Sequence, residues 1–263
     1  MATSDVKLLG LWASPFTTRV QMALKLKSIE FEFIQENLQN KSELLLKTNP
    51  VHKKVPVFIH GDKPISESLI IIQYIDDTWT NGPSILSSDP YDRAVARFWA
   101  AYIDDKWFPL LKELGSAQGD EAKASIMEKI FEGLVLLEEA FVKCSNGKVF
   151  FGGDNVGYLD IALGCYLGWV KATEIMTGVK WLDETKTPGL LGWAERLCSD
   201  SVVKDVLPEA QKLVELYTMS AAKEKAVVPI TDRAQDGTRR GCKKGSNREI
   251  TRVNAVRRCF RQM

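Results

Sequence analysis

The sequence is poor in the residues that build metal sites and disulfide frameworks. It has two histidines, His52 and His60, with no set of further ligand residues nearby, and its five cysteines include no CxxC pair. An odd number of cysteines is typical of free thiols in a reducing compartment. No apolar stretch approaches the roughly 18 residues that span a bilayer, and the N-terminus lacks the segments of a signal peptide. These absences predict a cytoplasmic chain with no bound metal and no membrane contact.

Charge is nearly balanced over the 263 residues but is unevenly distributed. Residues 1–222 carry 23 basic and 30 acidic side chains, a net charge of −7, whereas residues 223–263 carry 12 and 4, a net charge of +8. Apolar periodicity also stops in this last segment, as is typical of a disordered tail. We favour a frame-shifted or read-through end for residues 223–263 and regard nucleic acid as an improbable partner. The alternative is a nuclear-localisation or nucleic-acid-binding arm.

A short apolar run near the N-terminus ends where a helix is predicted to begin. The run covers residues 6–12, and a helix with a buried stripe is expected over 17–27. Pro15 suits the first turn of that helix, which places Ser14 at the N-cap. A hydroxyl beside the free amides of a helix start favours an anion. In thioredoxin-like proteins this corner carries a reactive cysteine. The serine indicates that any thiolate here comes from a ligand.

Two further segments suit the binding of an extended peptide. Val55-Pro56 precedes a short strand, and a proline there is suited to a cis peptide bond, which leaves backbone groups free to pair. Glu67 and Ser68 open the next predicted helix, where amides and polar side chains favour a carboxylate or an ammonium group.

The order of predicted elements indicates two domains of different class. Residues 1–80 show strand, helix and strand, then two close strands and a helix, the order of a thioredoxin-like α+β domain. A linker over 81–90 follows, marked by turn residues. Residues 91–222 are predicted to form an all-helical domain. Its expected helices cover 93–108, 122–142, 157–170, 188–197 and 203–216, and Asp160 lies at the third helical position after Gly157, as in a capping box.

Several motifs taken together resemble a cytosolic glutathione transferase. They are Ser14-Pro15-Phe16, Lys41-Ser42, Lys54-Val55-Pro56 and Glu67-Ser68. The serine, the stretch over 36–42 and the stretch over 152–162 are similar to the plant tau class. The resemblance covers roughly residues 5–220. It implies the two-domain glutathione transferase fold, glutathione as co-substrate with no other cofactor, and a homodimer whose contacts include Tyr91, Arg93 and Arg97.

The resemblance also implies a role for each matching residue. Ser14 is expected to donate a hydrogen bond to the glutathione sulfur, with a simple N-cap as the alternative. Lys41 and Lys54 would contact the glycine carboxylate and Val55 the cysteinyl backbone, while Glu67 and Ser68 would hold the γ-glutamyl end. Taken alone, these charges would be read as solvated surface or cap residues. The expected walls of the hydrophobic site are Phe16, Leu38, Trp107, Phe108, Lys112 and Trp169. For Trp107 and Trp169, packing in the helical core is an equal alternative.

The function implied is conjugation of the glutathione thiolate to hydrophobic electrophilic small molecules, as in detoxification and stress responses. Reduction of organic hydroperoxides by the same thiolate is a further expectation. A protein that binds hydrophobic ligands without turnover is the alternative. A third reading, a thiol reductase, requires a cysteine at position 14 to form a mixed disulfide, and Ser14 argues against it.

Overall fold

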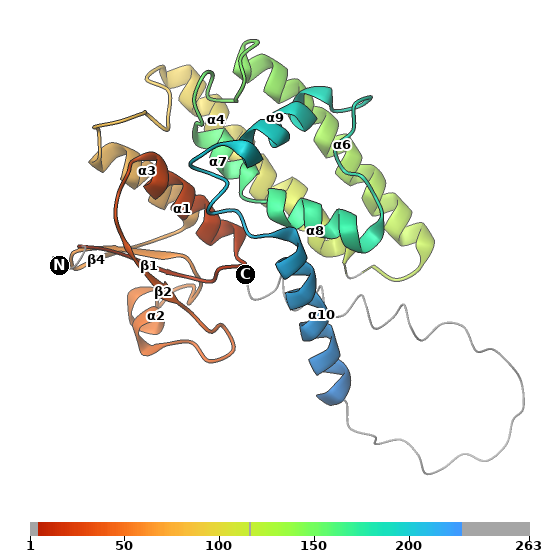
Figure 1. Cartoon of the computed structure of the whole chain (residues 1–263), viewed down its shortest axis with the longest axis horizontal. Coiled ribbons are helices and arrows are strands. Elements are labelled where there is room, and N and C mark those ends of the chain that lie inside the picture. The colour runs from red at the N-terminus through yellow and green to blue at the C-terminus, as the bar shows by residue number, and fades with distance from the viewer. Residues whose placement is uncertain (1–4, 116, 228–263) are drawn as a thin grey trace, which may run out of the picture.

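The computed structural model describes residues 5–115 and 117–227 and begins with a mixed four-stranded sheet (Figure 1). Its strands are β1 (Val6–Gly10), β2 (Glu32–Gln35), β3 (Val57–His60) and β4 (Lys63–Ser66), in the order β2-β1-β3-β4. β1 pairs in parallel with β2, with Leu8 opposite Phe33, and antiparallel with β3, with Leu8 opposite Phe58. The predicted thioredoxin-like order of elements is confirmed.

Alternation along β1 gives the sheet two apolar faces. Leu8 and Phe58 are buried in the large core, into which α1 (Pro15–Leu26) and α3 (Ser68–Thr78) also pack. The next residue, Leu9, belongs to a smaller cluster that contains Leu45 of α2 (Glu43–Thr48). The sheet is therefore covered by helices on both faces.

The second domain is helical, as predicted, although several boundaries differ. It comprises α4 (Pro90–Tyr102), a π-helical turn η1 (Ile103–Trp107), α5 (Phe108–Leu114), α6 (Asp120–Ser145), α7 (Tyr158–Gly164), α8 (Leu167–Thr177), α9 (Pro188–Ser199) and α10 (Ala210–Val227). None of these helices, nor any other in the described part of the chain, has the length and apolar character to cross a membrane.

Several expected boundaries are wrong, and the helix expected over 93–108 is divided into α4, η1 and the start of α5. The single helix expected over 157–170 is interrupted between Gly164 and Leu167, next to a glycine, the residue type that costs about 1 kcal/mol in a helix interior. The helix expected from residue 203 begins at Ala210, because Pro208 cannot occupy a helix interior without loss of a hydrogen bond. That helix continues to Val227 and so passes the predicted boundary at residue 222. Most of the expected tail, residues 228–263, lies outside the described residues.

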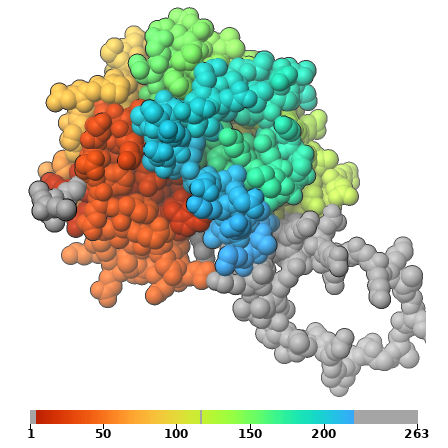
Figure 2. Space-filling view, viewed as in Figure 1, coloured from red at the N-terminus to blue at the C-terminus, as the bar shows by residue number. Residues whose placement is uncertain are grey.

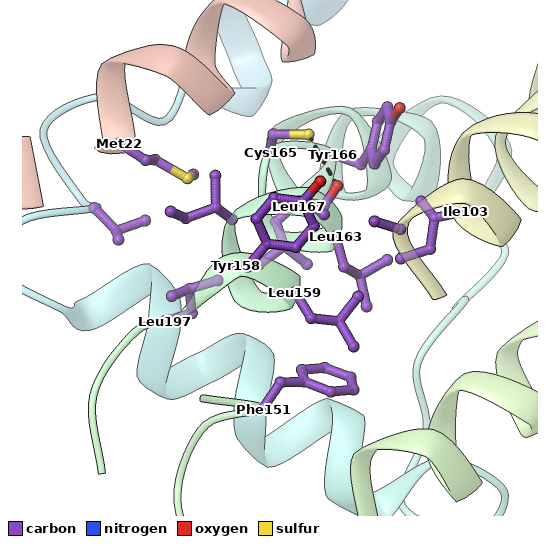
Figure 3. Packing of buried hydrophobic residues seen from close by; sticks show 14 of the residues in the cluster. Met22, Ile103, Phe151, Tyr158, Leu159, Leu163, Cys165, Tyr166, Leu167 and Leu197 are labelled. Atoms are coloured by element: carbon purple, nitrogen blue, oxygen red, sulfur yellow. Dashed lines mark hydrogen bonds between the residues drawn. The ribbon is translucent and has the colours of Figure 1, made fainter. Parts of the chain in front are cut away.

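One apolar core joins the two domains, which lie in close contact on the face shown in Figure 2. Figure 3 shows part of this core, where Met22 of α1 belongs to the same cluster as Tyr158 and Leu163 of α7. The linker is also fixed, because the Asp76 carboxylate accepts the amides of Ile85 and Leu86, each at 2.9 Å. The two domains are therefore joined both by a shared core and by a hydrogen-bonded linker.

Candidate functional site

Ser14 lies at the start of α1 with its hydroxyl buried. Its carbonyl accepts the amides of Thr17 and Thr18, each at 3.0 Å, and Pro15 occupies the first turn, so the predicted helix start is confirmed. The Ser14 side chain makes no cap bond, and its Oγ has no hydrogen-bond partner among the described residues. An unpaired buried hydroxyl costs about 1–3 kcal/mol. It is therefore available to a ligand atom that can accept a hydrogen bond.

A cavity of about 160 Å³ opens beside this corner. Its lining includes Lys54, Val55, Glu67 and Ser68, so four of the five predicted glutathione contacts come together around one space. The other lining residues are Phe16, Asn49, Pro56, Leu69 and Asp104. Ser14 does not line the cavity itself but lies two residues before Phe16, which does.

The turn before β3 forms one wall of the cavity. The Val55-Pro56 peptide bond is cis, as predicted. Asn49 holds the turn, since its side-chain amide donates to the Lys54 carbonyl at 3.0 Å while its oxygen accepts the His52 amide at 3.1 Å. The Lys41 ammonium donates to the Lys53 carbonyl at 2.8 Å. Lys41 therefore lies next to the rim of the cavity, outside its lining.

The opposite wall is the start of α3. Glu67 has φ +73°, a region that non-glycine residues occupy at a cost of about 1–3 kcal/mol. This conformation places its exposed carboxylate 3.7 Å from Nε2 of His52. The amides of Ser68 and Leu69 begin the helix, where no carbonyl of the preceding turn can pair with them. The wall thus offers an acidic side chain and amide donors to a zwitterionic group.

A buried arginine behind this wall was missed by sequence reasoning. Arg19 is fully buried, and its guanidinium binds both carboxylate oxygens of Asp104 at 2.8 and 2.9 Å. It also donates to Ser68 Oγ at 3.0 Å and to the Ala162 carbonyl at 2.8 Å. Tyr166 donates its hydroxyl to Asp104 at 2.9 Å, and burial raises the pKa of Tyr166 well above its ordinary value, so the phenol keeps its proton. The sequence did hold one signal for this buried role. Arg19 lies in a predicted helix, next to the residues that form the buried stripe of that helix.

Aromatic rings form a cluster at the side of the cavity that faces the helical domain. Phe16 meets Phe108 edge to face at 5.8 Å, and Phe108 stacks on Tyr166 at 4.3 Å. The Lys112 ammonium lies 4.7 Å from the centre of the Phe108 ring. Burial lowers the pKa of Lys112, and the nearby Lys54 charge lowers it further. Phe108, which is 2% exposed, therefore contacts Phe16 of the cavity lining from the interior, and the half-buried Lys112 lies over the Phe108 ring.

The remaining predicted wall residues lie in the interior. Trp107 is 2% exposed and donates to the Ile130 carbonyl at 3.3 Å. Trp169 is 3% exposed and donates to the Ala13 carbonyl at 2.8 Å, immediately before Ser14. Leu38 is buried in the small cluster with Leu45. Their burial favours the packing alternative, and Trp169 additionally fixes the backbone of the Ser14 corner.

Comparisons with known proteins agree with this arrangement. The family models for the N-terminal and C-terminal domains of glutathione S-transferase match residues 4–77 and 120–196. Glutathione S-transferase U17 of Arabidopsis thaliana is 61% identical over 216 residues, which cover 82% of this chain and 95% of that protein.

The chain belongs to the glutathione S-transferase family.

Solved structures place this glutathione transferase in the tau class. The crystal structure of a tau-class glutathione S-transferase from mango, Mangifera indica, has a TM-score of 0.81 and 59% identity, and the match covers 83% of this chain and 99% of that chain. Rice GST1, solved in complex with glutathione, has a TM-score of 0.75 and 36% identity over 84% of this chain and 99% of that one. These matches confirm both the predicted fold and the predicted class.

Proposed function

We propose that this tau-class glutathione transferase binds glutathione in the cavity between β3 and α3 and adds its thiolate to hydrophobic electrophiles. The observation that carries this proposal is the buried, unpartnered Ser14 hydroxyl at the start of α1. A glutathione sulfur beside the aromatic cluster would give this hydroxyl an acceptor. The turn before β3 carries Lys54, which suits the carboxylate at one end of the tripeptide. The start of α3 carries Glu67 and free amides, which suit the other end.

The thiolate requires help at neutral pH. A free thiol has a pKa of about 8.5, and each unit of depression corresponds to ~1.4 kcal/mol of preferential binding of the anion. The Ser14 hydroxyl and the free amides of the helix start together supply about one to two units. The thiol proton leaves to water, the sulfur forms a bond to the electrophilic carbon, and the leaving group departs with its electron pair. Ser14 donates a hydrogen bond throughout and forms no covalent bond.

Each predicted contact has a place in this scheme. Lys54, with Lys41 behind it, faces the glycine carboxylate, and Val55 pairs its backbone with the cysteinyl residue. Glu67 and the amide of Ser68 hold the γ-glutamyl end. Phe16 and Lys112 flank the electrophile, while the buried side chains of Phe108, Leu38, Trp107 and Trp169 support the site from behind. In support, Lys54, Val55, Glu67 and Ser68 line one cavity, and rice GST1 was solved with glutathione.

Replacement of Ser14 by alanine tests the thiolate role. We expect Ser14→Ala to lower the rate of conjugation of a chlorinated nitroaromatic by about 10- to 100-fold, because the hydrogen bond to the developing thiolate is lost. The dissociation constant of glutathione should stay within about threefold. An ultraviolet titration of the bound thiolate should show a higher pKa in the variant.

The matched control is Ser201→Ala, at an exposed serine in a turn before α10, which should behave as the unchanged protein. A full conjugation rate near pH 6.5 in Ser14→Ala would contradict the thiolate role. Glutathione binding without turnover in the unchanged protein would instead support a ligand-binding protein.

We also propose peroxide reduction and a cytosolic location for the enzyme. The thiolate would attack a hydroperoxide oxygen and release an alcohol; a second glutathione would then displace water from the sulfenic acid and form glutathione disulfide. Three cysteines of the described part, Cys144, Cys165 and Cys198, are free thiols, which suits a reducing compartment. Formation of glutathione disulfide from cumene hydroperoxide, and microscopy of a fluorescent fusion, test these two points.

A further inference from the structure

Both polar groups of the peptide unit that precedes Ser14 form hydrogen bonds. The N–H of this unit, which belongs to Ser14, donates to the Leu11 carbonyl at 2.9 Å. Its carbonyl, which belongs to Ala13, accepts the indole N–H of Trp169 at 2.8 Å. Because a peptide unit is planar and its N–H and C=O point in opposite directions, bonds at both ends oppose its rotation. The backbone that enters Ser14 is therefore held from two sides.

The two bonds come from different parts of the fold. Leu11 lies in the same turn as Ser14, a few residues earlier. Trp169 lies in α8 of the helical domain, 156 positions after Ala13. Beyond Ser14, its own carbonyl accepts amides from the first turn of α1, which is again a local contact. Trp169 thus restrains this corner from outside the first domain.

The Trp169 side chain is itself closely packed. It is 3% exposed and belongs to the large core, and Ala13 is fully buried. The neighbouring Gly168 lies against the Pro208 carbonyl, since a Cβ atom at Gly168 would be only 2.8 Å from that oxygen. Glycine permits such a close approach of backbone because it lacks a side chain. The indole N–H therefore reaches Ala13 from a helix that is held in place on its other side.

The Ser14 side chain differs from the Ser14 backbone, because its buried Oγ has no hydrogen-bond partner among the described residues. The direction of this hydroxyl is set by the backbone from which it projects. A hydrogen bond weakens steeply as its angle departs from linearity, so rotation of the preceding peptide unit would weaken a bond from Ser14 to the glutathione sulfur. The bond from Trp169 opposes this rotation.

We propose that Trp169 is a positioning residue for Ser14. By holding the peptide unit between Ala13 and Ser14, its indole N–H keeps the Ser14 hydroxyl directed at the glutathione sulfur and thereby favours the thiolate. This inference rests on the proposed function and adds to it a residue of the helical domain that acts on the thiolate through Ser14. A role of Trp169 in packing alone would affect stability and leave the ionisation of glutathione unchanged.

Trp169→Phe, which removes the indole N–H, tests the proposal. We expect the pKa of the bound glutathione thiol to rise by about half a unit and the conjugation rate at pH 6.5 to fall about threefold. At a pH well above that pKa the thiol is ionised in both proteins, so the two rates should converge. The dissociation constant of glutathione should change by less than about twofold. Ultraviolet titration of the bound thiolate and the pH dependence of the rate measure these effects.

Three comparisons separate the hydrogen bond from packing. Replacement of Trp169 by benzothienylalanine keeps the shape of the indole and removes only the donor, so it should give the same shift, and it serves also if Trp169→Phe does not fold. Trp181→Phe is the matched control, because Trp181 is 2% exposed and its indole N–H donates elsewhere, to Thr173 Oγ1 at 3.0 Å. This control should leave the thiol pKa unchanged. In a Ser14→Ala background, Trp169→Phe should cause no further rise.

A thiol pKa that stays the same when Trp169 loses its donor, while Ser14→Ala raises it, would overturn the proposal. So would an equal rise in Trp181→Phe, or a rise that persists in the Ser14→Ala background. If Ser14→Ala itself leaves the pKa unchanged, the proposed function fails at the thiolate step, and hydrogen exchange decides the inference without catalysis. The Ser14 amide should exchange faster in Trp169→Phe, since the peptide unit rotates more freely, and an unchanged exchange rate would contradict the role of Trp169.

Discussion

Asp104 provides the counter-charge for Arg19, the buried cation behind the site. Arg19 is completely buried, and its charge cannot be removed by deprotonation in a protein. Both oxygens of Asp104 bind this guanidinium, which in turn holds Ser68 at the start of α3. One carboxylate therefore both neutralises a buried charge and fixes a side chain of the proposed glutathione site.

We expect Asp104→Asn to lower the free energy of unfolding by about 3 kcal/mol, because it leaves Arg19 buried without a counter-charge. Urea unfolding followed by tryptophan fluorescence measures the change. The adjacent, exposed Asp105 is the matched control, and Asp105→Asn should change the free energy by less than about 0.5 kcal/mol. Equal effects of the two changes would show that the Arg19 pair does not support the fold.

At the scale of elements, the π-helical turn η1 explains how Asp104 reaches Arg19. A π-helical turn accommodates an extra residue and thereby re-aims the side chains around it. In η1, Asp104 faces α1 while Trp107, three residues later, packs into the helical core. Phe108, the first residue of α5, then meets Phe16. The π-helical turn thus places one side chain in the helical core and another against the buried arginine behind the site.

The start of α7 is a second element under strong local control. Asp160 is fully buried and accepts the amides of Phe151, Gly152 and Gly157 at 2.8–2.9 Å. Trp193 of α9 donates to it as well, at 2.7 Å. The predicted capping arrangement is confirmed, and the same carboxylate also fastens the preceding loop and a distant helix.

The charge of Asp160 makes the stability of α7 depend on pH. Burial raises the pKa of Asp160 from 3.8 to about 6, although its four N–H donors act in the opposite direction. The folded state binds the proton of Asp160 more tightly than the unfolded state does. The resulting contribution to the free energy of unfolding is therefore fully present below about pH 4. It is lost as pH rises through about 6, by about 3 kcal/mol in total.

We therefore expect the stability difference between the unchanged protein and Asp160→Asn, which does not titrate at this position, to shrink between about pH 4 and pH 7. Urea unfolding of both proteins at several pH values measures it. Asp77→Asn, at an exposed aspartate of α3, should show no such trend. A stability difference that grows with pH would mean that the four N–H donors lower the pKa of Asp160 more than burial raises it.

At the scale of the whole molecule, α3 and α4 leave apolar side chains exposed on neighbouring surfaces. Ile70, Tyr91 and Phe98 are 55%, 75% and 63% exposed. The two helices are joined by a hydrogen bond from Arg97 to Gln73 at 2.9 Å, so these side chains lie on adjoining elements. Exposed apolar surface of this kind marks protein contacts. We propose that it pairs with a second copy of the chain.

Phe98→Asp tests the homodimer. We expect it to shift the protein from dimer to monomer in sedimentation velocity, because a charge would be buried in the interface. The control is Ile175→Asp on α8, which is exposed to a similar degree, 56%, but lies away from α3 and α4. A monomeric unchanged protein, or a Phe98→Asp variant that stays dimeric, would contradict this interface.

Local chemistry explains which features the sequence determined by itself. The Ser14 corner, the cis bond before Pro56, the order of strands and helices along the chain and the capping residue Asp160 each depend on residues a few positions apart. N-cap, proline and periodicity signals report such short-range preferences directly. Four predicted glutathione contacts also come together around one cavity, because they lie at element ends that the fold brings to one edge.

Tertiary structure alone decided the contacts between residues far apart in the chain. Arg19 meets Asp104 across 85 positions, and Trp169 reaches Ala13 across 156. The same long-range packing buried Trp107 and Trp169, which the sequence left open between pocket and core. A residue's pattern in sequence reports its own conformational preference, whereas its burial and its partners depend on which distant surfaces the folded chain brings together.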